Sequence, residues 1–134
     1  MQPFDSRTRS QLLMLWIIWG AILGGLGILY LAFARRPAGT EGNLAVVLAA
    51  FSALFVSIII RWLIVPRVTS LVRLLPLFIV GLALAEGCGI IGLFLGGPYR
   101  DTLWVLGVLG VTSYVPLFAR RLSEPRASGF IPNN

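Results

Sequence analysis

Few side chains in this sequence can do chemistry. Its ionisable groups are eleven Arg, five acids and one thiol, Cys88, and it contains no His and no Lys. This inventory excludes His-ligated haem, Cys/His zinc sites, Ser-His-Asp triads, intrachain disulfides and Walker-type phosphate loops, so we expect no metal and no cofactor. The acids are Asp5, Glu41, Glu86, Asp101 and Glu124.

Glu86 differs from the other acids because it lies inside a long apolar run. Twelve residues separate it from Arg73, and eleven separate it from Pro98. If the run is a membrane helix, the carboxyl group lies near mid-bilayer, where an acid costs about 2.5–3.5 kcal/mol on insertion scales. Such residues face a bundle interior, a cavity or another protein. Glu86 is therefore the candidate ion-binding residue.

Two interpretations of Glu86 stay open. Desolvation favours the neutral form, so a proton could be exchanged when water or a cation comes near. Alternatively, the protonated carboxyl pins a helix pair through a hydrogen bond, with Ser52, Ser57, Tyr30 and Thr112 as candidate partners. No second ionisable group is predicted at the same depth, because Arg61 lies about 13 Å nearer the cytoplasm and is expected to extend to the headgroups. General acid–base catalysis needs such a partner, so we expect no enzyme.

The element that carries Glu86 is one of four apolar segments. With 57% hydrophobic and 12% charged residues and a mean hydropathy of +0.90, the composition is that of a membrane protein. We expect one transmembrane domain, residues 1–121, and a short cytoplasmic tail, residues 122–134. The fold class is all-α, an integral membrane four-helix bundle. Its predicted spans are residues 12–34, 44–65, 74–97 and 103–119.

The arginines predict the orientation, because cytoplasmic loops retain positive charge. The N-terminal segment, the cytoplasmic end of the second span, the loop at 66–73 and the C-terminal segment hold eight of the eleven, against three on the other side. Both termini are thus predicted to be cytoplasmic, in a bacterial inner (plasma) membrane. The net charge of +6 then indicates contact with anionic lipid, not nucleic acid. A cleaved signal peptide ending at Ala32, Phe33 and Ala34 is the alternative for the first span.

Small residues recur at helical spacing in every span, which allows close helix approach in lipid. They serve packing within the chain or between copies, so the lipid bilayer and either a homo-oligomer or other membrane subunits are the expected partners. Cys88, beside them, is expected to be an apolar filler. The predicted packing residues are Gly20, Gly24, Gly27, Ala45, Ala49, Ala53, Gly81, Ala85, Gly89, Gly92, Gly107 and Gly110.

The chain also aligns with itself. A shift of 62 residues matches the first span to the third, with Gly25 and Gly27 on Gly87 and Gly89. A shift of 59 residues matches the second span to the fourth, with Arg61 on Arg120. Shared Leu-rich composition is the alternative explanation. The pattern predicts two related helical hairpins with parallel topology.

Residues 82–94, LALAEGCGIIGLF, resemble the carboxylate-bearing helix of the rotor proteolipid, the c subunit of rotary ATP synthases. In that family a Leu-Ala-rich run leads to the ion-carrying Glu, followed by Ile four positions on and Gly-Leu at six and seven. The matching positions here are Glu86, Ile90, Gly92 and Leu93. The resemblance implies that Glu86 takes up a proton and releases it as a ring turns past an external Arg.

Three functions are consistent with these features. The first is a structural or accessory subunit of an oligomer or a larger membrane complex. The second is a proteolipid-like subunit that translocates protons or cations through Glu86, and the third is a small oligomeric transporter with Glu86 at its midplane. We expect the first.

Overall fold

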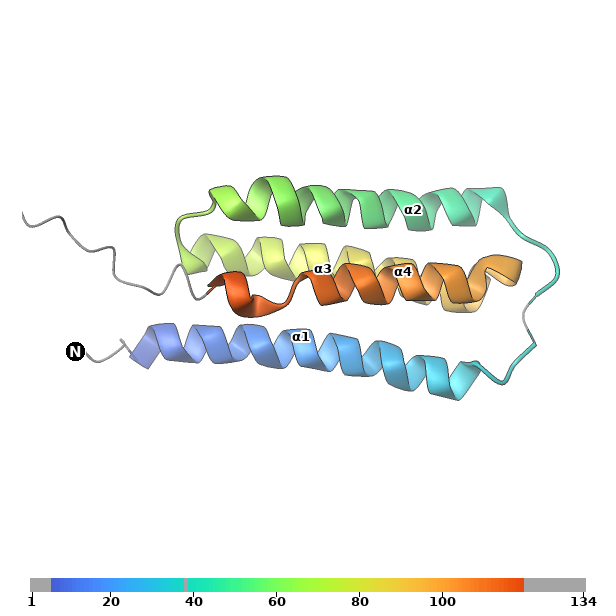
Figure 1. Ribbon diagram of the computed structural model, residues 1–134, viewed down its shortest axis with the longest axis horizontal. Coiled ribbons are helices and arrows are strands. Elements are labelled where there is room, and N and C mark those ends of the chain that lie inside the picture. The colour runs from blue at the N-terminus through green and yellow to red at the C-terminus, as the bar shows by residue number, and fades with distance from the viewer. Residues whose placement is uncertain (1–5, 38, 120–134) are drawn as a thin grey trace, which may run out of the picture.

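The structure is a computed structural model that describes residues 6–37 and 39–119. Every regular element in this part of the chain is a helix (Figure 1). Its four α-helices are α1 (Ser6–Phe33), α2 (Leu44–Ile59), α3 (Leu71–Leu95) and α4 (Arg100–Ser113). The predicted all-α class is therefore confirmed. The C-terminal tail and Arg120 lie outside the described residues.

Three helical segments are long and apolar enough to cross a membrane: Arg9–Phe33, Leu44–Arg67 and Leu71–Leu95. The second consists of α2, a π-helical turn (Ile60–Ile64) and a 3-10 turn (Val65–Arg67). Capping side chains start two of them, because Asn43 accepts from the Ala45 N–H at 2.9 Å and Ser70 from the Arg73 N–H at 3.4 Å. The protein is thus a membrane protein by the length and composition of its helices.

The fourth helix differs from the predicted span at 103–119. It begins at Arg100, ends at Ser113 after 14 residues, and is followed by a 3-10 turn, Pro116–Ala119. Pro116 explains the break, because proline lacks an N–H and its ring clashes with the carbonyl four residues earlier. At 1.5 Å per residue, α4 alone is about 21 Å long, shorter than a hydrocarbon core of about 30 Å.

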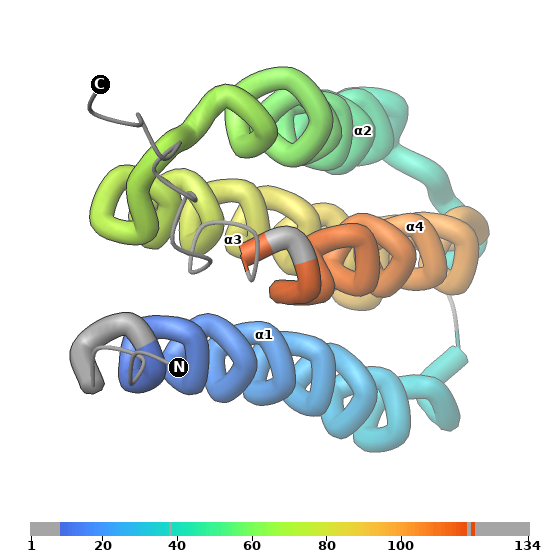
Figure 2. Tube along the Cα trace, turned by 60° about the vertical axis from the view of Figure 1, so that its left-hand side comes forward, coloured from blue at the N-terminus to red at the C-terminus, as the bar shows by residue number. Residues whose placement is uncertain are grey.

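The α3 and α4 helices form the centre of the molecule, and α1 and α2 lie on opposite sides of this pair (Figures 1 and 2). α3 packs against all three other α-helices. The chain runs back and forth, so that α1 is parallel to α3, and α1 begins at the same end of the molecule as the Pro116–Ala119 turn ends (Figure 1). α3 therefore positions most of the candidate site.

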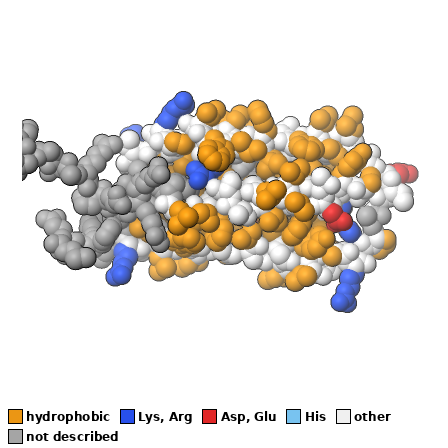
Figure 3. Space-filling model, in the orientation of Figure 1, with side chains coloured by type: hydrophobic (Ala, Val, Ile, Leu, Met, Phe, Trp, Pro, Cys, Tyr) orange, Lys and Arg blue, Asp and Glu red, His pale blue; other side chains and the backbone are white. Residues whose placement is uncertain are grey.

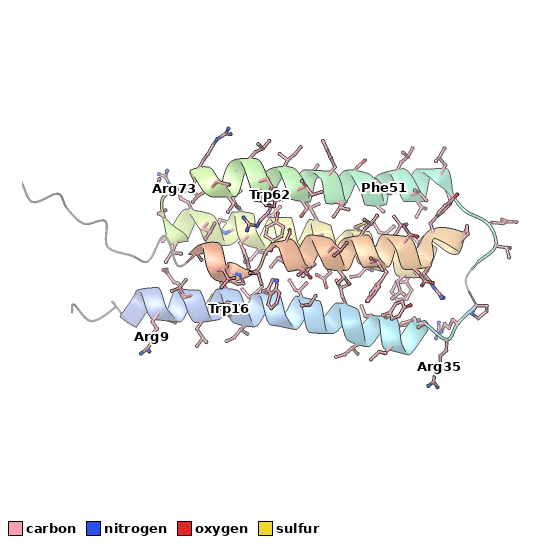
Figure 4. All side chains as sticks on the ribbon, viewed as in Figure 1. Arg9, Trp16, Arg35, Phe51, Trp62 and Arg73 are labelled. Carbon is pink, nitrogen blue, oxygen red and sulfur yellow. The ribbon has the colours of Figure 1, made fainter. Side chains whose placement is uncertain are left out.

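The surface matches a protein immersed in lipid. Hydrophobic side chains cover the length of the face shown in Figure 3, and most charged groups lie toward its two ends. Arg9 and Arg73 lie near one end and Arg35 near the other (Figure 4). The core is also apolar, with Leu15 and Leu26 of α1 packed against Phe78, Leu82 and other residues of α3.

Candidate functional site

The α3 and α4 backbones meet at glycines. A Cβ on Gly107 would lie 2.5 Å from the Gly89 backbone nitrogen and 2.6 Å from the Gly89 Cα. A Cβ on Gly92 would collide with the Leu103 Cβ, and one on Gly110 would lie 3.0 Å from the Ala85 Cβ. Of the predicted packing residues, Gly89, Gly92, Gly107, Gly110 and Ala85 are thus brought together in one seam.

A buried polar cluster joins α2, α3 and α4 beside this seam. The Tyr114 hydroxyl donates to the Ser57 carbonyl at 2.6 Å, and the Ser57 hydroxyl donates to the Gly81 carbonyl at 2.7 Å. Gly81 leaves the space that the Tyr114 ring fills, because a Cβ there would collide with the Tyr114 hydroxyl. Tyr114 and Ser57 are almost completely buried, where hydroxyls need hydrogen-bond partners. The two bonds above supply these partners within the protein.

Side chains from outside α4 reach two of its C-terminal carbonyls, of which that of Val111 also accepts from the Tyr114 N–H. The Arg61 Nε donates to the Ser113 carbonyl at 2.7 Å, and the Trp19 Nε1 donates to the Val111 carbonyl at 2.9 Å. The Arg61 guanidinium also lies 6.0 Å from the centre of the Tyr114 ring. Since lipid offers no hydrogen bonds, such partners make a helix break tolerable at membrane depth. The Nε of Arg61 is thus engaged within the chain, and the expected extension of Arg61 to the headgroups stays a prediction.

Glu86 lies on a different side of α3 from this cluster. At 100° per residue, it projects about 140° away from Gly81 around the helix. It belongs to a row of exposed and half-buried residues, spaced by three or four, that no helix covers fully and that we call the Glu86 strip. The strip consists of Val72, Pro76, Ile79, Ala83, Glu86 and Ile90.

The Glu86 carboxyl is half-buried, and it has no hydrogen-bond or ion-pair partner among residues 6–37 and 39–119. Three of the four predicted donors bond elsewhere. Ser52 donates to the Leu48 carbonyl at 2.8 Å, Thr112 to the Val108 carbonyl at 2.7 Å, and Ser57 to Gly81. Tyr30 instead stacks on Trp104 at 4.1 Å between ring centres. The carboxyl is therefore unsatisfied within the described chain.

Arg61 is not the partner of Glu86. The Ser57–Gly81 hydrogen bond puts these two residues at one depth. Arg61 lies four residues from Ser57 toward one end, and Glu86 five residues from Gly81 toward the other, which separates them by about 13 Å along the helix axes. α3 also lies between them, since Arg61 is on its α2 side and the Glu86 strip on a side that α2 does not cover.

The predicted small residues of α1 and α2 have fewer neighbours. A Cβ on Gly20, Gly24 or Gly27 would meet no atom within 4 Å. On α2, Ala45 and Ala49 are exposed and Ala53 is half-buried, while the buried residues are Ala50, Leu54 and Ser57. Most of these predicted positions therefore face away from the other helices of this chain.

Cys88 is fully buried, and its thiol donates to the Leu103 carbonyl at 3.7 Å. The contacts of Tyr114 and Arg61 were not predicted from the sequence. A signal for the Arg61 contact was Pro116, because it ends a helix a few residues earlier and the last carbonyls of that helix require donors. Comparison with protein-family models, with curated proteins and with solved structures finds no match to this chain.

Proposed function

We propose that the protein is a small four-span membrane subunit that acts by lateral association, as a structural or accessory component of an oligomer or of a larger membrane complex. Its four helices form a bundle of two related hairpins, with both termini on the cytoplasmic side of a bacterial inner membrane. The excess of arginines at the end where α1 begins supports this orientation.

The fourth span is α4 extended by the Pro116–Ala119 turn. Four 3-10 residues at about 2 Å each add roughly 8 Å to the 21 Å of α4, which approaches the thickness of the hydrocarbon core. The break between them is supplied with donors from Arg61 and Trp19. This argument supports four spans although α4 alone is too short.

The observation that carries the proposal is the lack of a polar partner for Glu86 in the described chain. An unpaired carboxyl at mid-membrane is unfavourable, and the cost falls when a neighbouring helix supplies a donor or acceptor. The rest of the Glu86 strip is apolar, so a helix from a second copy or another subunit can pack along it with one hydrogen bond at Glu86. Interhelical hydrogen bonds of this kind contribute about 1–2 kcal/mol in model peptides.

Two substitutions at Glu86 test this proposal. Glu86→Gln keeps a donor and an acceptor, whereas Glu86→Leu removes both. We expect the Leu variant to shift the association equilibrium toward the monomer by about 5- to 30-fold, from 1–2 kcal/mol, and the Gln variant to stay close to the original protein. Ser52→Leu is the matched control, since Ser52 is exposed on α2 and bonds only to its own helix.

The measurement is the protein mass in mild detergent by light scattering after size exclusion, both for purified protein and for complexes solubilised directly from membranes. A mass equal to one chain in both preparations contradicts lateral association. Equal association of the Leu variant and the original protein contradicts the role of Glu86 in it.

A second function is supported by the position of Glu86. Its carboxyl is near mid-helix and only half-buried, so it can be reached from outside the isolated chain. Together with the resemblance of residues 82–94 to a rotor proteolipid, this favours a subunit or small transporter that carries protons or cations through Glu86.

This second function predicts a different response. A hydrophobic carbodiimide would modify Glu86, and Glu86→Gln would assemble normally but move no ions in liposomes. Normal ion movement by the Gln variant, or a carboxyl inert to the reagent, would leave only the accessory role.

A further inference from the structure

A small cavity lies at the end of the molecule opposite to Arg9 and Arg73. Its volume is about 150 Å³, and its walls come from the end of α1, the loop that follows, the end of α3 and the start of α4. Phe33, Leu93 and Phe94 form its apolar side, while Arg36 and Arg100 supply positive charge. The Phe33 and Phe94 rings pack edge to face at 4.7 Å.

Arg100 links two walls of this cavity. Its Nη1 donates to the Arg36 carbonyl at 2.7 Å and its Nη2 to the Ala34 carbonyl at 3.4 Å, which fixes the loop after α1 against α4. Its Nε donates to the Asp101 carboxylate at 3.2 Å, and this ion pair offsets part of the Arg100 charge. A guanidinium has five N–H groups, so two remain without an acceptor among residues 6–37 and 39–119.

Arg36 provides the second cation. Its guanidinium lies 4.4 Å from the centre of the Phe33 ring, which holds it at the cavity wall. Its N–H groups have no acceptor in the part of the chain that the structure describes. Arg35 and Arg36 are both exposed and carry the same charge, but only Arg36 lines the cavity.

The cavity therefore has two features that suit a phosphate group attached to a hydrocarbon. Arginine N–H groups bind phosphate oxygens, and apolar walls favour an attached hydrocarbon. It also lies where two of the apolar helices, α1 and α3, end, which is the level of lipid headgroups. We propose that this cavity binds a phosphate group at the membrane surface, and that the phosphate belongs to an anionic phospholipid.

This inference goes beyond lateral association and does not depend on it. From the proposed function it takes only that α1 and α3 span a membrane. Native mass spectrometry of the full chain in mild detergent tests it, with phosphatidylglycerol as the probe, phosphatidylcholine as the zwitterionic control and inorganic phosphate as the free anion. We expect retained phosphatidylglycerol, and about a fivefold loss of affinity in Arg36→Gln. Arg36→Lys keeps the charge and should lose less.

Arg35→Gln is the matched control, because it removes the same charge one residue away. Equal losses of affinity in the two Gln variants would show general attraction to the surface and overturn the site. Equal retention of phosphatidylcholine would overturn the preference for anionic lipid. Binding of inorganic phosphate in place of the lipid, with the same dependence on Arg36, would overturn the assignment to a phospholipid. None of these results affects the Glu86 experiment, so the two proposals fail separately.

Discussion

Replacing Gly107 with alanine perturbs the closest approach between α3 and α4. The new Cβ would lie 2.5 Å from the Gly89 nitrogen and 3.0 Å from the Ala85 carbonyl oxygen, and both of these are backbone atoms. An ordinary contact begins at 3.4 Å, so the two backbones must separate by roughly 0.9 Å, the difference between 3.4 and 2.5 Å.

Two opposing terms decide whether Gly107→Ala raises or lowers the free energy of unfolding. Alanine is favoured over glycine in a helix by up to about 1 kcal/mol, which stabilises the variant. Overpacking a tight interface, with the backbone shifts that it forces, costs about 1–3 kcal/mol. The α2 packing is affected as well, because Gly110 one turn away contacts Leu54. We expect Gly107→Ala to lower the free energy of unfolding by up to about 2 kcal/mol, the upper overpacking cost less the alanine gain.

The assay is reversible unfolding of the full chain by titrating a mild detergent with dodecyl sulfate, followed by circular dichroism. Gly87→Ala is the matched control, since Gly87 lies on α3 and a Cβ there would meet no atom within 4 Å. The control should be as stable as the original protein or slightly more stable. Stability of Gly107→Ala equal to that of Gly87→Ala would refute the backbone contact.

Three further variants can be measured in the same titration. Tyr114→Phe removes the hydroxyl that donates to Ser57 and should cost about 1 kcal/mol, and an unchanged midpoint would contradict this hydrogen bond. Arg61→Leu leaves the Ser113 carbonyl without its charged donor and should cost about 1.5–3 kcal/mol. The control Arg67→Leu, at the exposed end of the same helical segment, should cost less, and equal costs would count against the capping role of Arg61. Trp19→Phe keeps an aromatic ring but loses the donor to Val111, so about 0.5–1.5 kcal/mol is expected, and full stability would show that the indole N–H is dispensable.

The helices that carry the site were predictable because membrane length is a strong constraint. The expected span at 44–65 corresponds to the segment Leu44–Arg67, and the expected span at 74–97 to Leu71–Leu95. In lipid, backbone groups must be satisfied within the segment, so a long apolar run has few alternatives to a helix. The position of Glu86 near the middle of α3 follows from the same constraint.

The orientation of each helix about its axis was less predictable. Almost every residue of α2 is apolar, so no polar face marks the side that turns to lipid. The small residues Ala45, Ala49, Ala53 and Ser57 suggested one packing face, and of these the chain buries Ser57, together with Ala50 and Leu54. Ser57 explains this choice, because its hydroxyl must find a partner and does so at Gly81.

The end of α4 shows a second limit of the sequence pattern. Hydropathy alone continued the fourth span through Pro116, whereas the structure ends α4 at Ser113. The compensating contacts come from Trp19 and Arg61, which are 92 and 52 residues away along the chain from the carbonyls they reach. No local pattern contains such long-range pairing, so only the need for donors, and not their identity, could be predicted from Pro116.

Arg61 and Glu86 are thus used in opposite ways. Arg61 finds its acceptor inside the chain, at the broken end of α4, whereas Glu86 projects along an uncovered strip of α3 without a partner in the described residues. Loss of Arg61 should therefore reduce the stability of the single chain. Loss of Glu86 removes an unsatisfied group from that chain, so the isolated monomer should be no less stable, and any harm must arise at the contact with a second membrane component. Measuring unfolding and association on the same Glu86→Leu protein separates these two effects.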